Sequence, residues 1–250
     1  METIRDRAAW LRGGTEQCNI PPKPAKRPMR LVLLGAPGVG KGTQAELLCA
    51  KLATCHLSTG DVFRAAKRLR PCDCTPSLTS ALEYMRRGDL VPDETVLGIV
   101  AERGECLKCQ GGFLLDGFPR TVAQAEALEK LLTERDLKLD AVLNYQLPLE
   151  QVVARLSGRR TCAGCKAVFH VQALPPKVEG LCDHCGGKLE QREDDRPESI
   201  RVRMAAYEKS TLPLADFYQR RGLLVNIAAE GSPESIFQRT MSSLRKPGAV

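Results

Sequence analysis

A glycine-rich segment, GAPGVGKGT from Gly35 to Thr43, has the residue types and the setting of a phosphate-binding loop. A short apolar run of the buried-strand type, Arg30 to Leu34, precedes it, and a helical pattern of leucines follows it. The glycines can take backbone angles closed to other residues, so successive amide N–H groups can converge on phosphate oxygens. The positive end of the helix dipole and the Lys41 ammonium add attraction for the outer phosphates. The segment therefore predicts a nucleotide site.

Four cysteines form two pairs with the spacing of a metal site. Cys162-x2-Cys165 and Cys182-x2-Cys185 are separated by sixteen residues, which lies within the window for a four-thiolate zinc site. The surrounding segment is rich in Gly and Pro and has too few apolar residues for a core of its own, so a metal would supply the missing folding energy. Four protein ligands close the site, and the expected zinc is therefore structural. Iron can also occupy four thiolates, and the sequence leaves the identity of the metal open.

Four further cysteines occur as two close pairs, Cys72 with Cys74 and Cys106 with Cys109. They are either a second metal site or loop thiols, because both kinds of spacing also occur without metal. His170 and His184 lie beside the quartet and could compete as ligands, although an ordinary surface or packing role suits each of them better.

The composition is that of a globular protein. Of 250 residues, 43% are hydrophobic and 27% charged, which excludes collagen-like, coiled-coil and wholly disordered chains. No stretch approaches the roughly 18 uninterrupted apolar residues of a membrane helix. Lys and Arg number 37 against 30 Asp and Glu, a net charge of +7. This surplus suggests an anionic partner such as nucleic acid, acidic lipid or phosphate, and does not choose among them.

The first thirty residues mix acidic and basic side chains and lack the apolar run of a secretory signal. We therefore expect a cytoplasmic protein, in which an odd number of cysteines, 11, act as thiols or metal ligands and not as a disulfide framework. Residues 1–28 end in a stretch rich in Pro and Lys and are expected to form a flexible extension. The alternative is that Met29, directly before the first strand, is the true start.

The phosphate-binding loop departs from the general motif at one position. Gly42 follows Lys41 where the motif has Ser or Thr, and Thr43 comes one residue later, which weakens a magnesium-ligand role for the hydroxyl. The pattern GxPGxGKGT resembles the loop of adenylate kinases and related nucleoside monophosphate kinases. Further segments match that family in order over about residues 29–240: HLSTGDVFR (56–64), GDLVPDE (88–94), GFLLDGFPRT (112–121), ARLSGRR (154–160), REDD (192–195) and RVRM (201–204).

The resemblance implies that MgATP passes its γ-phosphoryl group to AMP, giving two ADP. It implies five catalytic cations: Lys41, Arg120, Arg159, Arg192 and Arg203. It implies ATP contacts from Gly38, Val39, Gly40, Lys41, Gly42, Thr43, Arg155, Arg159, Val168, Phe169 and Pro233. It implies AMP contacts from Thr59, Arg64, Asp89, Leu90, Val91, Gly117, Phe118, Pro119, Arg120, Gln124, Arg192 and Arg203. Asp116 would hold magnesium through bound water. Arginine suits such chemistry because its planar fork binds phosphate bidentately and keeps its proton.

Alternating strand and helix patterns predict an α/β fold. With the family resemblance, we expect a P-loop kinase with a five-stranded parallel sheet wrapped by helices, a monophosphate-binding arm and a zinc-ribbon-like lid. Strands are expected near Leu31, Cys55 and Phe113, at 140–147 and at 223–227, and helices at 149–156, 197–221 and 232–244. The expected core comprises residues 29–58, 92–157 and 196–250, the arm 59–91 and the lid 158–195. The cysteine segment occupies the position of the family's longer, metal-binding lid.

Three alternative functions differ in testable ways. A monophosphate kinase for another base is disfavoured because, by the resemblance, Thr59 and Gln124 indicate adenine. A P-loop zinc-ribbon protein that binds nucleic acid is disfavoured because aromatic residues make up only 4% and offer few stacking platforms. A scaffold without turnover does not explain why the five catalytic cations are present. We therefore expect ATP, AMP and ADP as partners, no nucleic acid, no membrane and a monomer.

Overall fold

A five-stranded sheet forms the centre of the protein, whose computed structural model describes residues 27–66, 75–87, 91–102, 107, 111–192 and 195–245. The strands are β1 (Met29–Gly35), β2 (Cys55–Ser58), β3 (Gly112–Asp116), β4 (Ala141–Gln146) and β8 (Leu224–Ala228). Their order in space is β2-β3-β1-β4-β8, and all neighbouring pairs are parallel. The predicted fold class, with its five-stranded parallel sheet, is confirmed.

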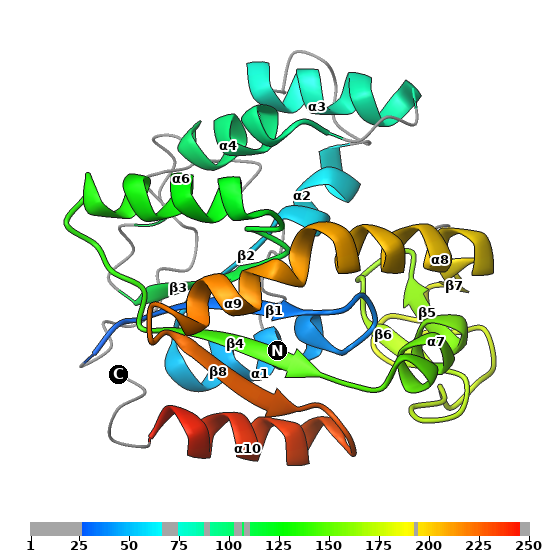
Figure 1. Cartoon of the computed structure of the whole chain (residues 1–250). Coiled ribbons are helices and arrows are strands. Elements are labelled where there is room, and N and C mark those ends of the chain that lie inside the picture. The colour runs from blue at the N-terminus through cyan, green and yellow to red at the C-terminus, as the bar shows by residue number, and fades with distance from the viewer. Residues whose placement is uncertain are drawn as a thin grey trace.

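Helices cover both faces of the sheet, which explains why the central strands are nearly continuous apolar runs. Leu31 and Leu33 of β1 pack on one face with α1 and α10, whereas Val32 and Leu34 pack on the other face with α4, α6 and α9 (Figure 1). The bounds of these helices are α1 (Lys41–Leu52), α10 (Pro233–Leu244), α4 (Asp93–Glu102), α6 (Val122–Thr133) and α9 (Pro213–Gln219). None of the described helices is both long enough and apolar enough to cross a membrane.

Two further helices extend from the edge of the sheet at β2. Helix α2 (Thr59–Ala66) follows β2 directly, and α3 (Pro76–Arg87) packs against α2 and α4. Figure 1 shows α3 at the end of the molecule farthest from the sheet. The predicted arm, residues 59–91, contains both helices, while its residues 67–74 and 88–90 lie outside the described ranges, as do residues 1–26 of the predicted extension.

A small antiparallel sheet follows α7 (Leu149–Gly158) at the carboxyl edge of the large sheet (Figure 1). It has the order β6-β5-β7 and is built from β5 (Arg159–Cys162), β6 (Val168–His170) and β7 (Leu189–Glu190). The chain then returns to the core through α8 (Pro197–Ala206) and α9, which Figure 1 shows running across the sheet. Predicted lid residues thus form a compact unit that borders the carboxyl ends of the parallel strands.

The single helix expected over residues 197–221 is interrupted. A π-helical turn, η4 (Tyr207–Thr211), separates α8 from α9, and the Leu212 amide donates to the Tyr207 carbonyl at 2.8 Å. The next residue, Pro213, has no N–H and cannot form the helical bond to residue 209. This local loss of a donor explains a wider turn where the sequence pattern alone predicted a continuous helix.

Truncation of a core side chain tests the assignment of the sheet interior. Leu114 of β3 is fully buried beneath α1, and Leu114→Ala should lower the free energy of unfolding by about 2–5 kcal/mol because a cavity remains. Leu149, at the start of α7, is 52% exposed, and Leu149→Ala should cost less than about 1 kcal/mol. Urea unfolding followed by circular dichroism measures both variants; equal losses would contradict the assignment.

Candidate functional site

The loop between β1 and α1 folds back over the side chain of its lysine. Lys41 Nζ donates to the carbonyl oxygens of Gly35 at 2.7 Å and Ala36 at 3.0 Å. Gly38 has φ +83°, and a Cβ at this position would lie 2.5 Å from Leu156 Cγ. Only glycine satisfies both the left-handed conformation and the close approach of α7. The predicted strand, glycine loop and helix are therefore present in the required order.

The charge of Lys41 is held in an unfavourable environment. Its pKa is lowered from 10.5 to about 8. Loss of hydration on burial is the largest cause, the positive charges of Arg120, Arg203 and Arg159 add to it, and the attraction of Asp116 opposes it. These groups come from four segments: the start of α1, the end of β3 and the loop after it, the start of β5, and α8. The fold thus brings three arginines within electrostatic reach of Lys41, an environment suited to a polyphosphate.

Asp116 ends β3 beside His56 of the neighbouring strand β2, and its Oδ2 lies 3.5 Å from His56 Nε2. Burial raises the pKa of Asp116, but hydrogen bonding and charge from His56, together with Lys41 and Arg120, outweigh burial and hold it below 3.8. The carboxyl group is therefore ionised at neutral pH. A Cβ at Gly42 would lie 3.9 Å from Asp116 Oδ2, an ordinary van der Waals contact, so the position that departs from the general motif borders this carboxylate.

The loop after β3 brings together three of the residues expected at the monophosphate. The Gly117 carbonyl accepts from Thr59 Oγ1 at 3.0 Å and from Arg120 Nε at 2.8 Å. Gly117 has φ +84°, and a Cβ there would lie 2.8 Å from Thr59 Oγ1. A larger residue would therefore be strained and would collide with the hydroxyl that bonds the Gly117 carbonyl. Phe118 is buried in the core, and its peptide bond to Pro119 is cis.

Two arginines meet at one buried carboxylate between the small sheet and α8. Asp195, which is fully buried, accepts from Arg159 Nε at 2.7 Å and from Arg159 Nη2 at 2.5 Å. Arg203 Nη1 lies 3.4 Å from the same carboxylate. Arg192 Nε donates to Thr161 Oγ1 of β5 at 2.9 Å. The sequence analysis named Arg159, Arg192 and Arg203 as functional residues. It gave no role to Asp195, although the motif REDD contains it.

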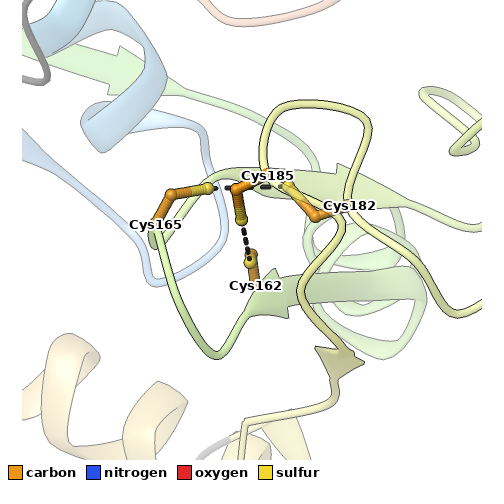
Figure 2. Close-up of side chains that lie close together, drawn as sticks. All are labelled: Cys162, Cys165, Cys182 and Cys185. Atoms are coloured by element: carbon orange, nitrogen blue, oxygen red, sulfur yellow. Dashed lines mark hydrogen bonds between the residues drawn. The ribbon is translucent and has the colours of Figure 1, made fainter.

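The four cysteines of the small sheet converge, as Figure 2 shows. Their sulfur atoms all lie within 4.8 Å of one another, with Cys162 and Cys185 3.4 Å apart and Cys165 and Cys182 3.5 Å apart. Tetrahedral zinc with Zn–S bonds of about 2.3 Å requires about 3.8 Å between sulfurs, so the arrangement fits such an ion.

Backbone surroundings also suit a metal centre. A Cβ at Gly187 would lie 3.0 Å from Cys162 Sγ and 3.3 Å from Cys185 Sγ, so a side chain there would crowd the sulfurs. The Gly187 amide hydrogen bond is the main cause that lowers the pKa of Cys185 to about 6. No other group of three or more candidate ligands occurs among the described residues.

Comparison with known proteins identifies the family. Residues 33–223 match the family model described as adenylate kinase. The adenylate kinase of Carboxydothermus hydrogenoformans is 49% identical over 218 residues, which are 87% of this chain and 100% of that protein. That of Caldicellulosiruptor bescii is 52% identical over 197 residues, 79% of this chain and 90% of its own length. The chain belongs to the adenylate kinase family. A third relative, the adenylate kinase of Archaeoglobus fulgidus, is 45% identical over 218 residues, 87% of this chain and 99% of its length.

Family membership makes the protein a kinase that binds nucleotides. The four clustered cysteines agree with the long adenylate kinase form that has a metal-binding lid. Neither alternative function, nucleic-acid binding or a kinase for another base, receives support from these comparisons.

One residue expected to read the base of AMP in adenylate kinases is already engaged within the protein. Gln124 is buried; its Oε1 accepts from the Arg120 amide at 2.7 Å, and its Nε2 donates to Asp93 Oδ1 at 2.7 Å. Thr121 Oγ1 donates to the other Asp93 oxygen at 2.7 Å. A base contact would have to share or replace these bonds, and that contact stays a prediction. Asp93, at the start of α4, was missed because its partners are about thirty residues away.

The expected adenine side of the ATP site lies where the loop after β1, the end of β8 and α10 approach one another. Arg155 donates to the carbonyl oxygens of Val39 at 3.1 Å and Ala229 at 2.9 Å. The Pro233 carbonyl accepts from Gln44 Nε2 at 2.8 Å. The fold thus brings Arg155 and Val39 together and anchors Pro233 through a buried glutamine that sequence reasoning missed.

Some residues expected to contact nucleotide have side chains packed elsewhere, and others lie outside the described residues. The Phe169 side chain is buried among the lid cysteines, so only its backbone could face a ligand, and Val168 pairs with Thr161 in the small sheet. Val91 packs against the core. Outside the described part of the structure lie Asp89, Leu90, the side chain of Arg64, and the second cysteine group, Cys72, Cys74, Cys106 and Cys109.

The two histidines near the quartet have other partners. His170 Nδ1 accepts from the amides of Gln172 at 3.1 Å and Ala173 at 3.0 Å, and its ring fills the space above Gly158. The His184 ring is tilted against Phe169 with 6.0 Å between centroids. Neither belongs to the cysteine cluster, as the sequence favoured.

Removal of the buried Asp195 carboxylate should lower the free energy of unfolding far more than removal of the exposed Glu129 carboxylate. Asp195→Ala leaves Arg159 and Arg203 without their shared anion and should lower the free energy of unfolding by about 3–5 kcal/mol. Glu129→Ala, which breaks the exposed pair with Arg221, should change it by at most about 1 kcal/mol. Urea denaturation of both variants gives the comparison, and losses of the same size would show that the Asp195 pair is not a buried anchor.

Proposed function

We propose that this adenylate kinase is an ATP:AMP phosphotransferase that converts MgATP and AMP into two ADP. The observation that carries the proposal is the gathering of cations near Lys41: Arg120 is bonded over Gly117, Arg159 and Arg203 share Asp195, and the charges of all three add to the effect of burial in lowering the pKa of Lys41. Cations gathered in this way repel one another, and anions bound among them remove that repulsion. Two nucleotides that meet with their phosphates end to end supply that charge.

The proposed reaction needs no nucleophilic side chain. An oxygen of the AMP phosphate attacks the γ-phosphorus, the bond from that phosphorus to the bridging oxygen breaks, and ADP leaves with the electron pair. The transition state is loose and spreads negative charge over the transferred group, so the protein acts by positioning and by supplying cations. Lys41 would hold the outer phosphates of ATP, Arg120 the phosphate of AMP, and Arg159, Arg192 and Arg203 the group in transfer.

The remaining contacts divide between the two nucleotides. Amides of Gly38 to Thr43 would bind the ATP phosphates, with Arg155, the Val168–Phe169 backbone and the Pro233 carbonyl around its adenine. Thr59, Arg64, Asp89 to Val91, Gly117 to Pro119 and Gln124 would surround AMP. Asp116 would hold the magnesium ion of MgATP through water, for which its depressed pKa is suitable.

We assign the arm to residues 59–91 and the lid to 158–195, and we propose that both close over the nucleotides. Closure would exclude water, which otherwise would compete with AMP for the γ-phosphoryl group. The Arg159–Asp195 pair supports this assignment because it joins the base of the lid to the segment that leads into α8. We also propose that the protein is a cytoplasmic monomer.

The preference for AMP is tested by comparing acceptors. ADP formation, followed with a coupled assay at fixed MgATP, should give a kcat/KM for AMP at least about tenfold above those for CMP, UMP and GMP, because a site that hydrogen-bonds one base leaves polar groups unpaired with another. A higher kcat/KM for CMP or UMP would overturn the proposed substrate.

We further propose that Cys162, Cys165, Cys182 and Cys185 hold structural zinc, which when bound stabilises the lid and takes no part in the chemistry. The sulfur distances and the glycine turn around the cluster support this assignment.

Replacement of one ligand should release the metal. Cys162→Ser should reduce the zinc content by one equivalent per chain and lower the melting temperature while the core stays folded, because the lid has little apolar core of its own. Cys55→Ser, outside the cluster, should keep the zinc content of the parent protein. Elemental analysis with thermal unfolding decides the question; unchanged zinc in purified Cys162→Ser would refute the assignment.

A further inference from the structure

A side-chain hydroxyl reaches the backbone of Arg120 from a distant part of the chain. Thr211 Oγ1 donates to the Arg120 carbonyl oxygen at 2.9 Å across 91 residues of sequence. The Arg120 amide donates to Gln124 Oε1 at 2.7 Å. Arg120 lies between β3 and α6, outside both elements, so side-chain bonds take the place of a strand ladder or a helix at its backbone amide and carbonyl.

The π-helical turn η4 presents this hydroxyl. Thr211 is the last residue of the turn and is half-buried, whereas the next residue, Leu212, is 51% exposed. A π turn inserts one extra residue, which rotates the following positions by about 100° relative to a regular helix. The insertion therefore changes which side chain faces the loop after β3, and π turns of a single turn are frequent at functional sites.

The turn is anchored from the core side. Leu214, Phe217 and Tyr218 of α9 are buried in the main hydrophobic cluster, while Ile200 is the buried residue of α8. Thr211 thus lies between α9, which packs on the core, and α8, which connects to the lid. A hydroxyl held in this way can act as a fixed support for the Arg120 backbone.

We propose that Thr211 is a positioning residue for Arg120. Its hydroxyl fixes the Arg120 carbonyl and thereby helps to hold the guanidinium over Gly117, where Arg120 Nε is bonded. This inference rests on the proposed function, in which Arg120 binds the phosphate of AMP. Without the support, binding of AMP has to order the Arg120 backbone as well, which reduces affinity.

Matched substitutions isolate the hydroxyl. Thr211→Val keeps the shape and removes the donor, so kcat/KM for AMP should fall about fivefold, mainly through a higher KM for AMP, with KM for MgATP unchanged. Thr211→Ser keeps the donor and should lie within about twofold of the parent enzyme. Thr133→Val removes a hydroxyl that bonds only within α6 at 2.8 Å, and it should leave both KM values unchanged.

Other outcomes overturn the inference. An unchanged KM for AMP in Thr211→Val, an equal rise in both KM values, or failure of Thr211→Ser to restore the parent value would each show that the hydroxyl does not position Arg120. Thr211→Ala should show the same split between the two KM values, so a folding defect in Thr211→Val leaves the test intact.

Arg120→Ala separates this inference from the proposed function. It should lower kcat/KM for AMP by roughly a hundredfold or more. If it does so while the Thr211 variants behave as the parent enzyme, only the positioning role is wrong. If Arg120→Ala leaves kcat/KM for AMP intact, the proposed role of Arg120 itself is wrong.

Discussion

Repulsion among cations at the carboxyl edge of the sheet is the constraint on which the rest of the structure depends. Burial is the largest cause that lowers the pKa of Lys41 to about 8, and the positive charges of Arg120, Arg203 and Arg159 act in the same direction. Such crowding costs stability in the free protein, and the phosphates of two nucleotides would offset it. Parallel topology makes the arrangement feasible, because the strands β1 and β3 release their loops at the same edge.

Two carboxylates make this crowding tolerable in different ways. Asp195 is fully buried and ties Arg159 to Arg203, so it holds two cations in fixed positions between the lid and α8. Asp116 is kept ionised beside His56 and faces the lysine, so it retains a charge that a magnesium–nucleotide complex can use. A protein interior normally avoids such conflicts, and their concentration at one place is the expected signature of a functional site.

Contiguous patterns predicted most of the fold and part of the site. The glycine loop, the buried strands and the cysteine quartet each lie within a short segment, and local chemistry alone determines their meaning. Long-range pairings were not predictable in this way. His56 meets Asp116 only because Ser58 and Asp116 are in register on neighbouring parallel strands, and Thr211 reaches Arg120 only because of a π turn before Pro213. The Gln124 amide likewise acquires partners that depend on how the loop after β3 folds.

The most direct test of the electrostatic account is the pKa of the Lys41 ε-amino group, measured by NMR titration of its ε-carbon in the free protein and with MgATP. The account predicts a pKa of about 8 in the free protein. With MgATP the pKa should rise above this value, because the phosphates attract the ammonium directly and offset the repulsion from the arginines. A pKa near the ordinary value in the free protein, or one that MgATP leaves unchanged, would contradict the central claim.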